Sequence, residues 1–338
     1  MLGLLCSPPA ATSTLDALAQ QRRLEAIASI EGTLSHVRAE VRAEPLFRLG
    51  GLYLEEAAVQ SPASRAGWLQ KAARALSLVV SRYPEYERAD EAAYLLAGVL
   101  RQLDRDDDVI AVLEELLRTR PNSRWAPGAC VLLGDAFAAR GDIGNAKAVY
   151  HGCTDRHDAE AGSRAWHGLA RIDRTIGDTA GADDAFRAAA ASAVRVLPGQ
   201  PRLMADVLRE HADMLDEAGR AAEVPEHLAG LLRQAEPLEA TAQRALVAVL
   251  LSEGWIEVGE PAARALLEGD PLAEDAPALH LQLVSALCRA GRLHDAQAEH
   301  ALMVTQYGAG SRWARRNHRA SGHAVQDIAA AQALVDVP

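Results

Sequence analysis

Aromatic residues are scarce in this sequence. They make up 4% of its 338 residues, although apolar residues as a whole reach 49%. The apolar content is mostly alanine and leucine, which are strong helix formers, whereas β-strands favour aromatic and β-branched residues. The shortage of strand-forming residues argues against a β-rich fold, and the composition predicts an all-α protein.

Other absences exclude whole classes of function. No apolar run reaches the roughly 18 residues that a transmembrane helix needs. Cationic residues are outnumbered, 35 against 46 acidic ones, and the formal net charge of −11 would repel a nucleic-acid backbone. The four cysteines lie far apart and form no CxxC pair. We therefore expect no transmembrane segment, no nucleic-acid partner, no disulfide framework and no zinc site built on paired cysteines.

Catalytic signatures are also missing. The sequence contains no GxSxG, HExxH or GxxxxGK[ST] motif, so we predict no catalytic residues and no cofactor. One group resembles a metal site, namely His151, Cys153, His157 and Asp158. Cys153 falls on an apolar helix position, where a free cysteine commonly fills a core, so we interpret the group as structural and expect no metal.

Repetition is the main positive feature of the chain. Residues 126–153 form two amphipathic helical patterns, broken at Arg140-Gly141-Asp142. Similar units begin near residues 90, 127, 163, 205, 240 and 277, and a further pair is predicted upstream. In that pair a helix from Leu46 is followed by an insertion containing Gln60-Ser61-Pro62 and then by a helix over residues 69–83. We count about seven helix pairs over residues 45–310.

The unit at residues 126–153 resembles the tetratricopeptide repeat. The resemblance rests on Leu133-Gly134, Phe137, Ala146, Tyr150 and Cys153, where small residues alternate with large ones at helical spacing. It implies a right-handed α-solenoid of stacked antiparallel helix pairs, whose first helices line a concave groove for a peptide or a partner protein. Residues 45–155 further resemble exported tetratricopeptide proteins of the cell envelope and gliding motility of myxobacteria and their relatives.

The two ends differ from the repeats. Residues 1–14 look like the remnant of a secretory signal or a disordered terminus. Residues 15–44 predict one amphipathic helix, with Ile27, Ile30, Leu34, Val37 and Val41 on one stripe. That helix packs on the first repeat or forms a short coiled coil with a partner. Residues 311–338 predict a polar capping helix and a tail, since a solenoid end faces water.

The candidate binding residues lie on the first helices of the repeats. A basic stripe and an acidic stripe occupy neighbouring units, and aromatic residues take equivalent places on two others: Arg164, His167, Arg171, Arg174; Asp206, Arg209, Asp213, Asp216; Phe47, Tyr94. The basic stripe fits an acidic peptide or a carboxylate, which arginine can bind through two hydrogen bonds. Alternatively the two stripes neutralise one another between repeats.

These observations favour a non-enzymatic scaffold that binds proteins, in the periplasm or at the outer membrane of a bacterium, with peripheral envelope association. A cytoplasmic tetratricopeptide regulator or chaperone-like adaptor is the first alternative, and an upstream leader sequence would distinguish the two. The second alternative is an enzyme on a helical-repeat scaffold, which would require acids and histidines that converge in a closed pocket.

Overall fold

The fold is entirely helical wherever it is described. The computed structural model describes residues 14–34, 36, 38, 41–154, 158–235 and 239–336, and within these ranges it contains helices and no strand. This confirms the all-α prediction. The chain divides into two compact units, residues 1–152 and 153–338. None of the described helices is long and apolar enough to cross a membrane.

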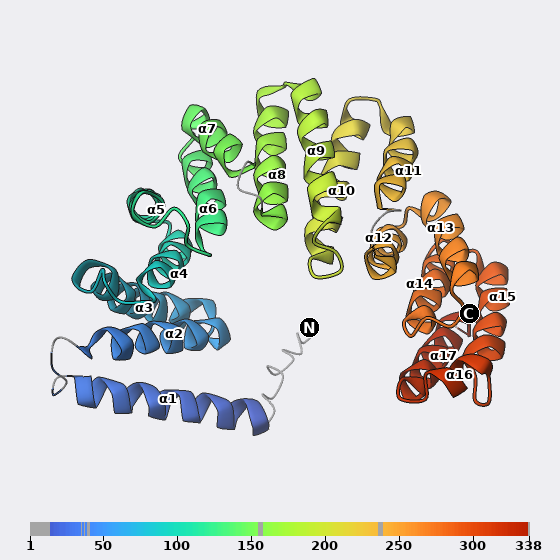
Figure 1. The fold of residues 1–338 in the computed structure, drawn as a ribbon, viewed down its shortest axis with the longest axis horizontal. Coiled ribbons are helices and arrows are strands. Elements are labelled where there is room, and N and C mark those ends of the chain that lie inside the picture. Colours follow the sequence, from blue (N-terminus) through green and yellow to red (C-terminus); the bar gives the residue numbers. More distant parts are fainter. Residues whose placement is uncertain are drawn as a thin grey trace, which may run out of the picture. The chain divides into compact units, whose positions relative to one another are not determined.

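The first unit begins with α1 (Thr14–Leu34), and its later helices follow in pairs (Figure 1). The pairs are α2 (Ala43–Val59) with α3 (Pro62–Arg82), α4 (Ala89–Gln102) with α5 (Asp106–Thr119), and α6 (Ala126–Ala139) with α7 (Ile143–Thr154), whose last residues pass the unit boundary. Each helix from α2 to α5 packs on the next one along the chain. Successive helices are thus neighbours in space, as in a helical-repeat fold.

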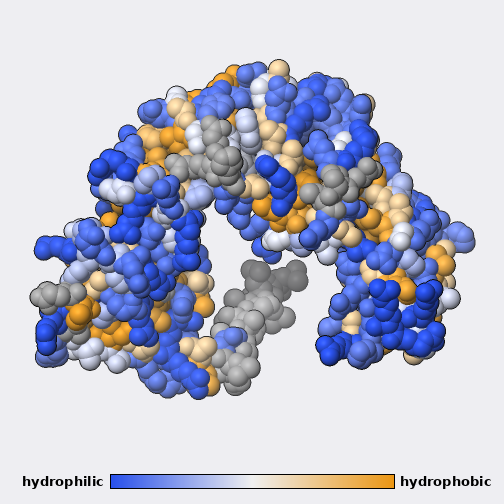
Figure 2. Space-filling model, in the orientation of Figure 1, coloured by the Kyte–Doolittle hydropathy of each residue, from blue (hydrophilic) through white to orange (hydrophobic). Residues whose placement is uncertain are grey.

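The second unit continues the same arrangement. Its pairs are α8 (Ala159–Ile176) with α9 (Thr179–Val194), α10 (Pro201–Glu217) with the 3₁₀ turn η2 (Ala221–Glu223) and α11 (Val224–Ala235), α12 (Ala240–Ser252) with α13 (Ile256–Gly269), and α14 (Ala276–Arg289) with α15 (Leu293–Tyr307). Two further helices, α16 (Arg312–Arg316) and α17 (Ser321–Val335), end the unit. On the face shown in Figure 2, hydrophilic residues cover most of its surface.

The turns inside the pairs after α2–α3 share one backbone geometry, whereas α2 ends at the extended Gln60. Gly141 follows α6 with a φ of 75°, a left-handed conformation that glycine adopts without steric cost. The next amide, on Asp142, donates to the carbonyl of Phe137 at 2.9 Å, which closes the end of the helix. Glycines with the same sign of φ end the other first helices at positions 177, 219, 254 and 291, and Asp104 takes this role after α4. The predicted break at Arg140-Gly141-Asp142 is confirmed.

Small residues allow the paired helices to approach closely, as the repeat pattern predicted. A Cβ atom added to Gly134 in α6 would lie 2.5 Å from the ring of Tyr150 in α7. Tyr150 is itself buried, with 2% of its surface exposed, and donates its hydroxyl proton to Asp135 at 2.6 Å. Gly50 makes the same kind of contact with Leu76 between α2 and α3.

The prediction for the N-terminal region was wrong in its boundaries. Residues 15–44 do not form one helix, because α1 ends at Leu34 and α2 begins at Ala43. Val37 and residues 1–13 lie outside the described residues. The supposed insertion is also absent, since α3 begins at Pro62, where proline at the first helical position needs no amide partner. The helix α1 packs on α2, and its Arg23 pairs with the fully buried Glu56 at 3.0 Å.

The C-terminal region is less polar than predicted. It forms two helices in place of one, and α17 packs against both α14 and α15 through the buried Ala324, Ala331 and Val335. Before it, Trp313 is 1% exposed and donates its indole proton to the carbonyl of Ala273 at 2.6 Å. The apolar end of the last repeat is therefore covered by small side chains and one tryptophan.

The expectation about cysteines needs a correction. Cys130 in α6 and Cys153 in α7 are both disulfide-bonded, whereas Cys288 is a free thiol. The spacing of the cysteines gave no sign of this, because residues far apart in sequence meet only after the helices pack. Cys153 does lie at a buried position, as the repeat pattern required, but not as a free cysteine.

Candidate functional site

The first helices of the second unit lie next to one another. The helix α8 contacts α10, α10 contacts α12, and α12 contacts α14. Their outward positions carry charged side chains, and each of these helices ends near a glycine-containing turn. The candidate binding residues on α8 and α10 therefore share one continuous surface within this unit.

The basic stripe on α8 is paired with carboxylates. Arg164 binds Glu160 of its own helix at 3.1 Å. The other three side chains reach across to α10, where His167 and Arg171 approach Glu210 at 3.1 and 3.7 Å and Arg174 binds Glu217 at 2.5 Å. His167 Nε2 lies at ion-pair distance from Glu210 without the geometry of a hydrogen bond. The stripe is thus largely neutralised by the neighbouring helix.

The predicted acidic partners were the wrong ones. Glu210 and Glu217 meet the α8 cations, whereas Asp213 and Asp216 are exposed and take part in no ion pair among the residues described. Asp206 binds Arg209 of its own helix at 3.2 Å, and Arg209 continues to Glu253 after α12 at 3.0 Å. The ion pairs that α8 and α10 form with each other and with Glu253 therefore make up a row at the surface, called here the ion-pair ladder. The carboxylates of Asp213 and Asp216 take no part in it.

The two aromatic candidates are part of the packing between helices in the first unit. Phe47 is 6% exposed, and the guanidinium group of Arg88 lies 4.1 Å from its ring centroid. Tyr94 is half-buried and stacks on Trp125 with 4.9 Å between centroids. These contacts give both rings a structural role and leave only Tyr94 with an accessible edge.

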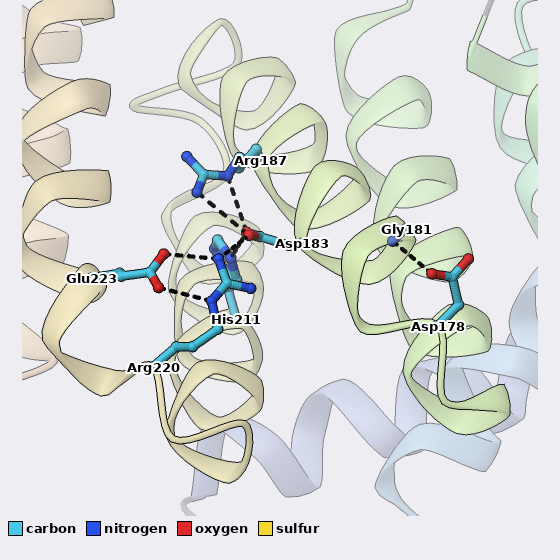
Figure 3. A network of polar contacts seen from close by, with 7 residues as sticks. All are labelled: Asp178, Gly181, Asp183, Arg187, His211, Arg220 and Glu223. Atoms are coloured by element: carbon cyan, nitrogen blue, oxygen red, sulfur yellow. Dashed lines mark hydrogen bonds and ion pairs between the residues drawn. The ribbon is translucent and has the colours of Figure 1, made fainter.

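A second polar centre, which the sequence did not predict, lies between α9, α10 and η2 (Figure 3). Asp183 of α9 is 7% exposed and accepts hydrogen bonds from three side chains. Arg187 donates to it at 3.0 Å, His211 of α10 at 2.8 Å and Arg220 at 2.8 Å, and Arg220 also binds Glu223 at 2.8 Å. Buried polar groups are costly unless paired, and here each donor has a partner.

The protonation states in this centre follow from burial and hydrogen bonding. Burial alone would raise the pKa of Asp183, but the bonds from Arg187, Arg220 and His211 outweigh it and hold this pKa below its usual range. Burial lowers the pKa of His211, and Asp183 only partly offsets this. The pKa of His227, whose ring stacks on that of His211 at 5.0 Å, is also lowered by burial. At neutral pH both imidazoles are uncharged beside an ionised carboxylate.

A pocket of about 320 Å³ opens beside these groups. Its wall combines apolar side chains of α10 and α11 with the polar residues Arg187, His211, Glu223 and His227. The residues of the group suspected from the sequence have other roles where they are described. Cys153 is disulfide-bonded, His157 lies outside the described residues, and Asp158 caps α8 by accepting the amide proton of Ala161 at 2.8 Å.

One feature of the sequence could have revealed the polar centre. His211 lies between Leu208 and Leu215 on the apolar stripe of α10, at a spacing that places all three on the same face. A histidine at a core position requires a buried partner. The identity of that partner could not be read from the sequence, since Asp183 is 28 residues away in the chain.

Comparisons with known proteins add little. No family model matches the chain, and no curated protein matches it. Among solved structures, MamA from Desulfovibrio magneticus is 17% identical, with 56% of this chain and 97% of that chain covered and a TM-score of 0.38. A thermophilic tetratricopeptide protein from Thermus thermophilus is also 17% identical, with 62% and 99% covered and the same TM-score. The helical-repeat fold therefore rests on the helix pairs of the chain itself.

Proposed function

We propose that this protein is a non-enzymatic scaffold that binds other proteins through the first helices of its repeats. The observation that carries the proposal is the contact of α8 with α10 and of α10 with α12, which joins their outward faces into one charged surface. Such a surface exists before a partner arrives, so binding costs little ordering of the scaffold. Its rigidity comes from helix pairs that bury their apolar faces on their neighbours.

The partner segment binds over the ion-pair ladder of α8 and α10. A carboxylate of the partner could reach Arg171 and Arg174, because their present pairs with Glu210 and Glu217 lie at the surface and are weak. A partner carboxylate that displaces Glu217 from Arg174 forms the same two hydrogen bonds that the glutamate now makes. An acidic segment or a C-terminal carboxylate fits this chemistry.

We place the protein outside the cytoplasm, in the bacterial periplasm or at the outer membrane. The disulfide-bonded state of Cys130 and Cys153 supports this location, since disulfides persist in oxidising compartments and are rare in the cytosol. The resemblance of residues 45–155 to exported envelope proteins points the same way. A cytoplasmic adaptor remains the competing proposal.

Two experiments test these proposals separately. Affinity capture from envelope fractions, with mass spectrometry, compares the wild type with an Arg171→Glu, Arg174→Glu variant. Arg118→Glu is the control, because that arginine is as exposed as Arg171 and its ion pair within the described residues is with Glu115 of its own helix. We expect the double variant alone to lose partners, and unchanged capture would refute the binding surface.

Thiol alkylation of protein from cells, before and after reduction, tests the location. Labelling of Cys130 and Cys153 without reductant would contradict it.

A further inference from the structure

We propose that Asp183, His211 and His227 form a binding site for a divalent transition-metal ion such as Zn²⁺. The three residues come from α9, α10 and α11, and each offers one ligand atom, all of which lie within 4.8 Å of one another. No other group of this kind occurs among the histidines, cysteines and acids in the described ranges. The site lies apart from the ion-pair ladder that carries the proposed function.

The geometry is close to what zinc requires. A tetrahedral zinc ion holds nitrogen and oxygen ligands at about 2.0–2.2 Å, so its ligand atoms lie about 3.3–3.6 Å apart. The nitrogen of His211 and the oxygen of Asp183 are 2.8 Å apart in a hydrogen bond, and the proton between them moves to the other ring nitrogen of His211 when the ion binds. The ring of His227 is stacked beside that of His211. A shift of about 1 Å in His227, which is half-buried on a short helix, would bring it within ligand distance.

The chemistry of the donors also fits. Zinc binds imidazole and carboxylate groups, and these three residues supply two imidazoles and one carboxylate. Nδ1 of His227 is buried and has no hydrogen-bond partner among the described residues. A buried imidazole nitrogen without a partner is stabilised when it binds a ligand. The adjoining pocket offers an entry path and room for water as a fourth ligand.

Two arginines compete with the ion for Asp183, and this competition provides a test of the proposal. Arg187 and Arg220 hold the same carboxylate that the metal needs. Arg220 would retain Glu223, but Arg187 has a half-exposed side chain whose only ion pair in the described residues is with Asp183. The metal therefore competes chiefly with Arg187 for Asp183. Removing that arginine should strengthen metal binding, whereas removing a ligand should weaken it.

The experiment titrates the full-length, tag-free and metal-free protein with ZnCl₂ by calorimetry. We expect one saturable site, at least about tenfold weaker binding in His227→Gln and at least about tenfold tighter binding in Arg187→Gln. His294→Gln is the control, since that histidine is exposed and distant in sequence, and circular dichroism establishes that all variants are folded. Absence of a saturable site, or a His227→Gln variant that binds as the wild type does, overturns the proposal.

Cobalt substitution identifies the ligands independently. Co²⁺ bound to nitrogen and oxygen ligands absorbs weakly in the visible range and lacks the charge-transfer band of a cobalt–thiolate bond. We expect the wild type to show a weak visible spectrum without that band. The His227→Gln variant should lose this visible spectrum. A thiolate band would instead place the ion on a cysteine such as Cys288, the free thiol among the described cysteines, and would refute the assignment.

Discussion

The close contact between Gly134 and Tyr150 gives a prediction whose sign is decided by competing effects. Replacing a glycine within a helix by alanine normally stabilises it by about 0.5–1 kcal/mol, because the unfolded chain loses freedom. At Gly134 the new methyl group would meet three ring atoms of Tyr150 at 2.5, 2.6 and 2.9 Å. Carbon atoms prefer separations of about 3.5–4.0 Å, so the ring or the helix must move by about 1 Å.

Tyr150 has little freedom to move away. It is buried, and its hydroxyl group is held by Asp135 on the same helix as Gly134. Overpacking of a core costs about 1–3 kcal/mol, so Gly134→Ala should lower the free energy of unfolding by about 1–2 kcal/mol after the gain in helix propensity. Gly98→Ala is the matched control, because Gly98 lies inside α4 and has open space where its Cβ would be. We expect that variant to be stabilised.

Urea unfolding, followed by the helical signal in circular dichroism, measures both changes on the same protein. The reasoning requires opposite signs for the two variants. If Gly134→Ala raised the unfolding midpoint as Gly98→Ala does, α6 and α7 would not approach as closely as described, and the role of small residues between paired helices would be refuted.

Three further outcomes are expected. Asp183→Asn should lower the free energy of unfolding by about 1–3 kcal/mol in urea titrations, because it removes the charged acceptor of buried His211 and of two half-exposed arginines. Stability should fall as the pH drops below about 6.5, since His211 and His227 have lowered pKa values and the unfolded chain then binds protons that the folded chain does not. Thermal unfolding between pH 5 and 8 measures this fall, and His227→Phe should make the unfolding temperature less dependent on pH. Trp313→Ala should cost about 3–5 kcal/mol in the same urea assay, and Trp125→Ala less, because only Trp313 is fully buried.

The repeat architecture was predictable because its determinants are local. The turn at Gly141 and the small residue at Gly134 each act on neighbours within one helix pair, and the sequence places them at fixed offsets. The predicted boundary of the N-terminal helix was wrong because no local signal of this kind marks it. The apolar stripe through Ile27 and Leu34 continues in the sequence to Val41, but periodicity alone does not show that the helix stops at Leu34.

The candidate site was predictable only in part. That the α8 residues share one face of their helix was predictable, since residues three or four positions apart lie on the same side. The carboxylates opposite it were not, because Glu210 and Asp213 differ by less than one turn, and the rotation of α10 about its axis depends on its buried residues. The bond between Asp183 and His211 likewise depends on packing between repeats, which no local pattern encodes.

The exposed ladder and the buried centre respond differently to substitution, and this difference separates binding from stability. Each exposed pair on α8 and α10 contributes about 0–1 kcal/mol, so reversing Arg171 and Arg174 changes the charge of the surface at a small cost in stability. Asp183 is buried, and changing it destabilises the fold before it changes a surface. If the Arg171, Arg174 variant loses partner capture while its thermal midpoint stays nearly unchanged, the loss reports on recognition. The same loss in an Asp183 variant would not, because that variant is also less stable.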